Sequence, residues 1–210
     1  MKTKVLLGFG ALAVVAGAAL FTMMGSGFVM ADVPPAPEIG TKAPDFALKD
    51  YDGKEHKLSG HAGSVVVLVF TSQDCPYSRA GDNALAKFAE QYKDKGVTIL
   101  SIDSHAGATA EKVKEFATSG NETKKLLPYP ILLDTGNVYA DKMGAKRTPE
   151  VYIVDKAGNL VYHGALDNGK KLDEAGYESY IAKVADELLA GKPVSTPKTS
   201  AYGCSIKRVS

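Results

Sequence analysis

This chain has only two cysteines, Cys75 and Cys204, in 210 residues. A cysteine-based zinc ribbon needs several thiolate ligands, and a C-x-x-C redox centre needs two cysteines three positions apart. The two cysteines lie far apart in the sequence, so both kinds of centre are excluded within one chain. No metal and no cofactor is therefore predicted.

A surplus of positive charge is also lacking. The 25 Lys and Arg residues nearly balance the 24 Asp and Glu residues, for a formal net charge of +1. Two of the positive charges, Lys2 and Lys4, lie in the first residues, and without them the balance is −1. No cluster of Lys and Arg with interleaved aromatic residues is present, so no nucleic-acid partner is predicted.

One long hydrophobic run stands at the N-terminus. Lys2 and Lys4 precede an uncharged stretch that runs to Ala31, and Val29-Met30-Ala31 is typical of a cleavage site. Residues 1–31 are therefore predicted to be a signal peptide, with Asp32 as the mature N-terminus. The alternative is an uncleaved anchor, because Val5 to Met24 is long enough to span a bilayer. With either a signal peptide or an anchor, residues 32–210 are predicted to be exported to the periplasm or beyond. Only an uncleaved anchor would hold the protein at a membrane.

The remaining residues, 45% hydrophobic overall, predict one α/β domain at 41–191 between a linker at 32–40 and a tail at 192–210. The run at 65–70 is apolar and β-branched, as in a central strand buried on both faces. A helix from Cys75 towards Gly96 and a strand at 97–102 follow, which makes a βαβ unit with parallel strands. The other predicted elements are a hairpin at 45–58, helices at 109–118 and 136–143, a strand at 131–133, a hairpin at 151–154 and 160–162, and a helix at 174–189.

Cys75 is the strongest candidate for a reactive residue, because of its position in the predicted fold. It follows the predicted central strand and opens a helix, with Pro76 suited to the first helical position. Unsatisfied N–H groups and the positive end of the helix dipole favour a thiolate there and lower its pKa. The four histidines, His56, His61, His105 and His163, show no ligand spacing and are predicted to be surface or hydrogen-bonded residues.

Several short motifs resemble the thioredoxin-like redoxin families, and in particular the peroxiredoxin-like branch of the alkyl hydroperoxide reductase/thiol-specific antioxidant group. The resemblance covers Ile39 to Gly164 and extends to the C-terminus. It rests on Gly40-x-x-Ala43-Pro44-Asp45-Phe46, Phe70-x-x-x-x-Cys75-Pro76-Tyr77, Leu133-Asp134, Thr148-Pro149, Val154-Asp155-x-x-Gly158 and Gly203-Cys204-Ser205-Ile206-Lys207. It implies a thioredoxin fold, with a central mixed β-sheet flanked by helices.

The resemblance also implies roles for individual residues. In such proteins the proline after Thr148, here Pro149, forms a cis peptide bond and lies against the active thiol. Many relatives carry C-x-x-C, but here Ser72 takes the first cysteine's place. A Ser or Thr three residues before the cysteine that attacks peroxide is the peroxiredoxin pattern, which Ser72-x-x-Cys75 matches. The proline that usually lies four residues before that Ser or Thr is replaced by Leu68.

The resulting hypothesis is an exported thiol peroxidase with antioxidant activity. Cys75 would attack a peroxide and become a sulfenic acid, with Ser72 as a hydrogen-bond donor and Arg147 as a nearby positive charge. Cys204, on a mobile tail, would condense with the sulfenic acid to form a disulfide, and an external thiol would reduce it.

Three alternatives remain open from the residues alone. The first is disulfide exchange with a protein partner through a mixed disulfide. The second is a non-catalytic binding module in which Cys75 and Cys204 form a structural disulfide. The third is a buried, inert Cys75. Thiol reactivity separates the catalytic readings from the others, since a catalytic cysteine is expected to have a pKa well below 8.5.

Overall fold

A computed structural model describes residues 33–209 of the chain. The predicted signal peptide or anchor at 1–31 lies outside these residues. Among residues 33–209, no helix is both long enough and apolar enough to cross a membrane.

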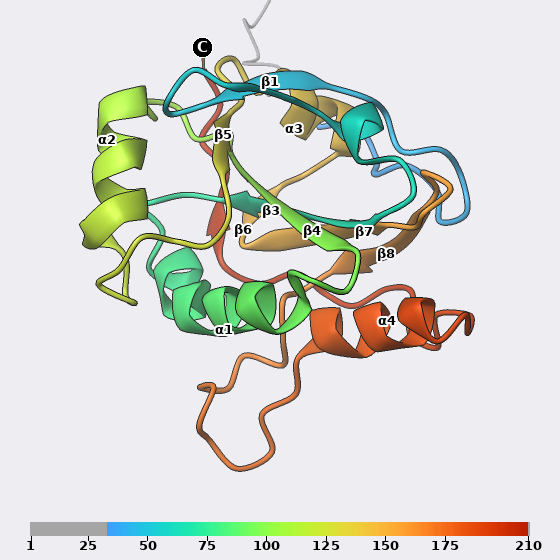
Figure 1. Cartoon of the computed structure of the whole chain (residues 1–210). Helices are drawn as coiled ribbons and strands as arrows, with labels where there is room; N and C mark the ends of the chain where they lie inside the picture. Colours follow the sequence, from blue (N-terminus) through green and yellow to red (C-terminus); the bar gives the residue numbers. More distant parts are fainter. Residues whose placement is uncertain (1–32, 210) are drawn as a thin grey trace, which may run out of the picture. The chain divides into compact units, whose positions relative to one another are not determined.

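The described residues form a seven-stranded mixed sheet in the order β2-β1-β5-β4-β3-β7-β8 (Figure 1). Strands β3, β4 and β5 run parallel, whereas β7 and β8 form an antiparallel hairpin beside β3, and β1 and β2 form another beside β5. The strands are β1 (Ala47–Asp50), β2 (Glu55–Lys57), β3 (Val65–Thr71), β4 (Val97–Asp103), β5 (Ile131–Leu133), β7 (Glu150–Val154) and β8 (Leu160–Gly164).

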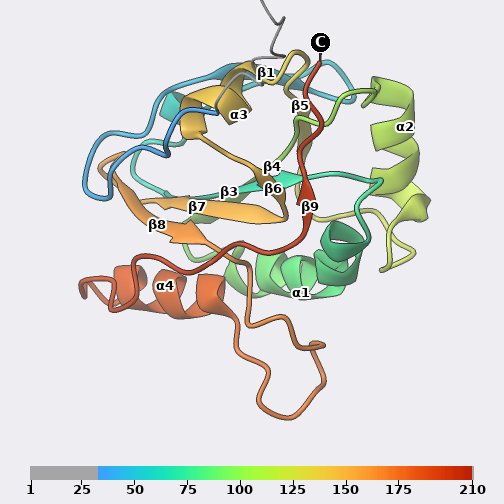
Figure 2. The ribbon, with the colours of Figure 1, turned by 180° about the vertical axis from the view of Figure 1, so that it is seen from behind.

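Helices cover both faces of this sheet. The helical segments are η1 (Leu58–His61), α1 (Pro76–Tyr92), α2 (Ala110–Glu115), η2 (Phe116–Gly120), α3 (Val138–Met143) and α4 (Tyr180–Leu189). Helices α1 and α4 lie side by side on one face, and α3 lies on the other, as both ribbon views show (Figures 1 and 2). This arrangement confirms the predicted thioredoxin fold.

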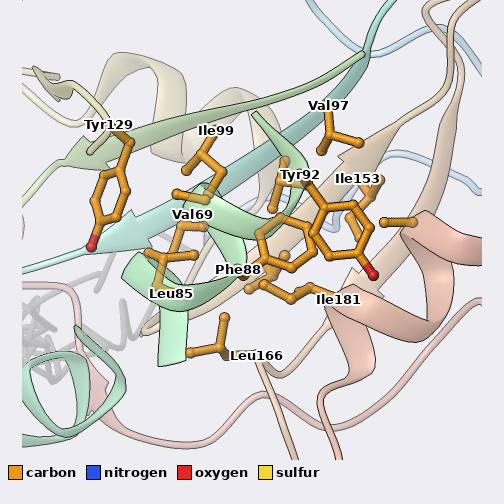
Figure 3. Close-up of a cluster of buried hydrophobic side chains, with 14 of the residues drawn as sticks. Val69, Leu85, Phe88, Tyr92, Val97, Ile99, Tyr129, Ile153, Leu166 and Ile181 are labelled. Carbon is orange, nitrogen blue, oxygen red and sulfur yellow. The ribbon is translucent and has the colours of Figure 1, made fainter. Parts of the chain in front are cut away.

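The larger core lies between the sheet and helices α1, α2 and α4. Alternate residues of β3, including Val67 and Val69, point into it, and Leu85, Phe88 and Tyr92 of α1 meet them (Figure 3). Phe88 stacks on Tyr92 with ring centroids 4.4 Å apart. Leu85, Phe88 and Tyr92 recur at helical spacing and form the buried face of α1, which fixes how the helix lies on the sheet.

A second core fills the other face, where Leu68 and Phe70 of β3 meet Tyr139 and Met143 of α3. Because β3 contributes to both cores, all seven of its residues are buried, as its continuous apolar run predicted. Residues 33–40, predicted as a linker, pack against this layer. Gly144, at φ +66°, lies so close to residues 34–36 that a Cβ atom there would overlap their backbone.

Two sequence predictions need correction. The last helix begins at Tyr180, not near residue 174, because Gly176 adopts φ +78° and the Ser179 side chain caps the helix at the Ala182 N–H. Tyr177 therefore lies in a loop. The C-terminal segment is also not a mobile tail, since it contains β9 (Cys204–Ser205), which pairs with β6 (Arg147–Thr148).

Leu68 in the centre of β3 is fully buried, so its replacement tests this packing. We expect Leu68→Ala to lower the free energy of unfolding by about 2–5 kcal/mol, because the lost methyl groups leave a cavity. Denaturant titration followed by circular dichroism measures this loss. Val138→Ala is the control, since Val138 is 58% exposed and its truncation should change little. A loss below about 1 kcal/mol for Leu68→Ala would contradict the described core.

Candidate redox site

The Cys75 thiol lies where β3 ends and α1 begins. Cys75 is the N-cap residue of α1, in extended conformation, and Pro76 is the first helical residue. Its side chain is 2% exposed. The predicted placement of this thiol at a helix N-terminus is therefore confirmed. Within residues 33–209, the N-terminal N–H groups of α1 have no side-chain cap at this residue, so they are available to the sulfur.

The Thr148–Pro149 peptide bond lies against this thiol. The bond is cis, as the resemblance predicted. The Cys75 Sγ atom donates a hydrogen bond to the Thr148 carbonyl oxygen at 3.0 Å. The turn before β7 therefore contacts the thiol directly.

Cys204 reaches the same place from the C-terminal segment. Strands β6 and β9 form an antiparallel pair in which Cys204 lies opposite Thr148. Figure 2 shows β9 as the red strand beside β6. The backbone approach requires Gly203, where a Cβ atom would overlap the Thr148 carbonyl oxygen. Both cysteines are free thiols in the structure, Cys75 buried and Cys204 partly exposed.

The two thiols shift each other's pKa in opposite directions. Burial raises the pKa of Cys75, but the Cys204 thiol, the Thr148 side chain and the Ser78 N–H of α1 all favour the thiolate, and the net pKa is lowered. The pKa of Cys204 is raised by its hydrogen bond to Cys75, by burial and by the Cys75 charge. Cys75 therefore ionises first, with Cys204 as a protonated neighbour.

The remaining predicted site residues lie close by but differ in orientation. Ser72 is buried, and its hydroxyl accepts a hydrogen bond from the Asp74 N–H at 3.2 Å, which shapes the loop before Cys75. Arg147 is exposed, and its guanidinium donates to the Gly203 carbonyl at 3.1 Å. This contact ties Arg147 to the segment that carries Cys204.

The Thr148 hydroxyl is a buried polar group with spare hydrogen-bonding capacity. Thr148 is 1% exposed, and within the part of the chain that is described its Oγ1 has no hydrogen-bond partner of ordinary geometry. The Thr148 side chain is also one of the groups that lower the pKa of Cys75, and the Thr148 carbonyl oxygen lies 3.0 Å from the Cys75 sulfur. A buried hydroxyl without a partner at a thiol is suited to an oxygen or sulfur anion formed there.

Contacts on both sides of Cys204 hold the C-terminal segment. Upstream, Thr199 accepts from the Ala165 N–H at 2.9 Å. Downstream, Ile206 is buried in the second core and its N–H donates to the Lys146 carbonyl. Arg208 then pairs with Asp141 at 2.9 Å. The prediction that this segment is mobile is therefore wrong. The segment packs against the rest of the domain, and its strand β9 carries Cys204.

Sequence reasoning missed Glu150, which follows Pro149 and is 4% exposed. Its signal was a single carboxylate at the start of an otherwise apolar strand, Glu150 to Val154. The predicted hydrogen-bonded state of His163 is confirmed, because His163 pairs with this carboxylate at 2.7 Å. The described residues include no group of three or more His, Cys, Asp or Glu side chains placed to hold a metal ion.

Fold and site together define a thioredoxin-fold protein with a thiol redox centre. The model of the AhpC/TSA family matches residues 39–163, more than half of the chain. The chain belongs to the AhpC/TSA family.

Named relatives include both kinds of thiol enzyme. The chain is 28% identical to the thiol-disulfide oxidoreductase ResA of Bacillus thuringiensis over 70% of this chain and 79% of the relative. It is 31% identical to the chloroplastic peroxiredoxin Q of Sedum lineare over 64% of this chain and 74% of the relative. A solved structure of the hypothetical protein SMc02350 from Sinorhizobium meliloti 1021 matches with a TM-score of 0.72 and 29% identity, over 83% of this chain and 97% of that one.

The contact between the two thiols predicts a measurable effect on Cys75. We expect Cys204→Ala to raise the pKa of Cys75 by about one to two units, because a hydrogen bond to a charged group is worth about 1.5–3 kcal/mol. The pH dependence of Cys75 alkylation in the reduced protein measures this pKa. Cys204→Ser keeps a donor and should give a smaller rise. Equal pKa values in wild type and Cys204→Ala would show that the thiols do not interact.

A buried carboxyl on α1 predicts a pH-dependent stability. Burial raises the pKa of Asp82 to about 7, although the Glu122 N–H and Arg79 oppose the shift. The folded protein therefore binds this proton more tightly than the unfolded chain, and the associated stability is lost as pH rises from about 4 to about 7. We expect Asp82→Asn to remove roughly 4 kcal/mol of this loss, since the shift is about three pKa units and each unit is worth about 1.4 kcal/mol.

Denaturant titrations at several pH values test this expectation, with Asp94→Asn on the exposed surface as the control. A parallel pH profile for wild type and Asp82→Asn would rule out the raised pKa.

Proposed function

We propose that this protein is an exported thiol peroxidase that reduces peroxides through Cys75, with Cys204 as the resolving cysteine. The observation that carries the proposal is the strand pairing of Cys204 with Thr148, whose carbonyl oxygen accepts a hydrogen bond from Cys75 Sγ at 3.0 Å, at the N-terminus of α1. Beside this geometry, the pKa of Cys75 is lowered and the pKa of Cys204 is raised. Such a pair holds a nucleophile and a protonated partner in the same place. Export rests on the sequence of residues 1–31.

In the first step, the Cys75 thiolate attacks one peroxide oxygen. The O–O bond breaks, Cys75 is oxidised to a sulfenic acid, and the other oxygen leaves as an alcohol or water after taking a proton. The N–H of Ser78 favours the thiolate before attack. The buried Thr148 hydroxyl, which has no ordinary partner within residues 33–209, is available to the peroxide or to the developing oxyanion.

In the second step, the Cys204 sulfur attacks the sulfur of the sulfenic acid. A Cys75–Cys204 disulfide forms, and the hydroxyl leaves as water with the Cys204 proton. Two equivalents of an external thiol then reduce the disulfide and are themselves oxidised to a disulfide. Since β9 pairs Cys204 with Thr148, whose carbonyl contacts the Cys75 sulfur, we expect the second step to need no large movement of the C-terminal segment.

The other predicted residues support these steps. Pro149 and Thr148 form the turn against the sulfur, and Ser72 shapes the loop that precedes it. Arg147 holds the Gly203 carbonyl and so helps to position Cys204.

Disulfide exchange with a protein partner is the second candidate function. Cys75 is only 2% exposed, whereas Cys204 in the C-terminal segment is partly exposed. A large partner would therefore reach the sulfur of Cys204 before that of Cys75. A surface groove also begins at Pro76 and is lined by Arg79, Glu122 and residues 171–173, which provides room for a polypeptide. A purely structural Cys75–Cys204 disulfide remains the non-catalytic alternative.

One oxidation experiment separates these three functions. The reduced mature protein receives one equivalent of hydrogen peroxide, and peptide mapping follows trapping with a sulfenic-acid probe and a thiol alkylator. We expect a Cys75–Cys204 disulfide in wild type and an accumulated Cys75 sulfenic acid in Cys204→Ser. Cys75→Ser should abolish peroxide consumption, because the low-pKa nucleophile is lost.

The other outcomes identify the alternatives. Slow reaction with peroxide but rapid exchange with oxidised glutathione would favour disulfide exchange. A disulfide that only forms slowly and resists reduction until the protein unfolds would favour a structural role. If the Cys75→Ser variant still consumes peroxide, the peroxidase proposal is contradicted.

A further inference from the structure

The buried carboxylate of Glu150 is a charged group that the redox steps do not use. It stands directly after Pro149, at the start of β7 in the sheet, and is 4% exposed. A buried carboxylate costs free energy unless hydrogen bonds and opposite charge compensate it. Burial raises the pKa of Glu150, but His163 and two backbone N–H groups outweigh burial, and the net pKa is lowered.

One carboxylate oxygen of Glu150 clamps the turn that covers Cys75. Its Oε2 atom accepts hydrogen bonds from the N–H groups of Lys146 and Arg147, both at 2.7 Å. The turn from 146 to 150 is therefore closed by one side chain. Thr148, whose carbonyl oxygen accepts a hydrogen bond from the Cys75 sulfur, is in the middle of that turn.

The other carboxylate oxygen links the turn to the C-terminal segment. Oε1 accepts from the Tyr152 hydroxyl at 3.1 Å and pairs with His163 Nε2 at 2.7 Å, and the Tyr152 and His163 rings stack at 4.2 Å. The backbone of His163 in turn bonds to Pro197 and Thr199. The same carboxylate thus contacts both β6 and His163 of β8, and His163 bonds to the segment that leads to Cys204.

We propose that Glu150 is the positioning residue of the redox pair. By holding β6 in place, it keeps Thr148 against Cys75 and keeps the β6 backbone ready to pair with β9, which carries Cys204. Glu150 acts through the turn and does not touch a reacting atom. The proposal rests on the proposed role of Cys75 and Cys204 as a redox pair.

Two substitutions at Glu150 separate positioning from charge. Glu150→Ala leaves the Lys146 and Arg147 N–H groups without their acceptor. Glu150→Gln loses the charge but keeps an amide oxygen for these two donors, and its NH₂ group can face Tyr152 and His163. We therefore expect Gln to restore what Ala loses.

Two measurements follow the thiols. The first is the ratio of dithiol to disulfide in a glutathione redox buffer, which we expect Glu150→Ala to shift about tenfold or more towards the dithiol. The second is the alkylation rate of Cys75 in the fully reduced protein, expected to rise by about tenfold or more, because the released turn uncovers the sulfur. These sizes correspond to the cost of leaving buried amide donors unpaired. Glu150→Gln should remain within about threefold of wild type in both, the spread left by small changes in a retained hydrogen bond.

Asp50→Ala is the matched control. The Asp50 carboxylate accepts from two backbone N–H groups, of Asp52 and Lys54, and pairs with His56 at 2.8 Å, in the hairpin of β1 and β2. It makes the same kind of clamp, but in a hairpin separated from β7 by three strands. We expect Asp50→Ala to lower thermal stability and to leave both thiol measurements unchanged.

The proposal is overturned if Glu150→Ala behaves like Asp50→Ala, with lower stability and unchanged thiols. It is also overturned if Glu150→Gln is as defective as Glu150→Ala, because charge and not position would then be the cause. If Glu150→Ala does not fold, His163→Ala removes one partner of Oε1, and unchanged thiols in that variant contradict the proposal. If wild type forms no disulfide, the proposed function fails, while the alkylation of reduced Cys75 still tests Glu150.

Discussion

The backbone pairing of Thr148 with Cys204 is the contact on which the redox site depends. It joins the cis-proline turn to the C-terminal strand and brings together two cysteines that are far apart in the sequence. The close approach is possible because residue 203 is a glycine. On the other side of the sulfur atoms, the N-terminus of α1 supplies N–H groups that favour negative charge. The site is thus built from three segments, and each is held by the body of the protein.

The antiparallel pairing of β3 with β7 explains why these segments meet. Strand β3 ends at Thr71, directly before the loop to Cys75, and the antiparallel strand β7 starts beside that end, because Phe70 pairs with Glu150. The turn before β7 and the loop after β3 therefore lie at the same edge of the sheet. The C-terminal segment is bound to that edge through β6 and Ile206. The relatives are named both as peroxiredoxins and as thiol-disulfide oxidoreductases, so the fold alone does not choose between these two activities.

Elements with a strong local pattern were predictable. The apolar run of β3, the helix α1 and the hairpin of β7 and β8 each carry a local pattern, and all three were predicted close to their observed positions. The start of α4 was not, because helical periodicity continues through Gly176 while the backbone there is left-handed. Residues 192–210 were predicted to be a tail, because their few apolar residues show no strand pattern. The order of this segment comes from long-range contacts such as Arg208 with Asp141.

The amino-acid sequence by itself determined the fold class, the position of Cys75 at a helix N-terminus and the candidate residues Ser72, Thr148, Pro149 and Cys204. These follow from local patterns and short motifs, which act over a few residues. Only the tertiary structure decided that Cys204 pairs with Thr148 beside Cys75, that Arg147 holds the Gly203 carbonyl, and that Glu150 closes the turn. The physical reason is that these contacts join residues from separate segments. Strand pairing and the burial of Ile206 and Glu150 bring those segments together, and no local pattern encodes that pairing.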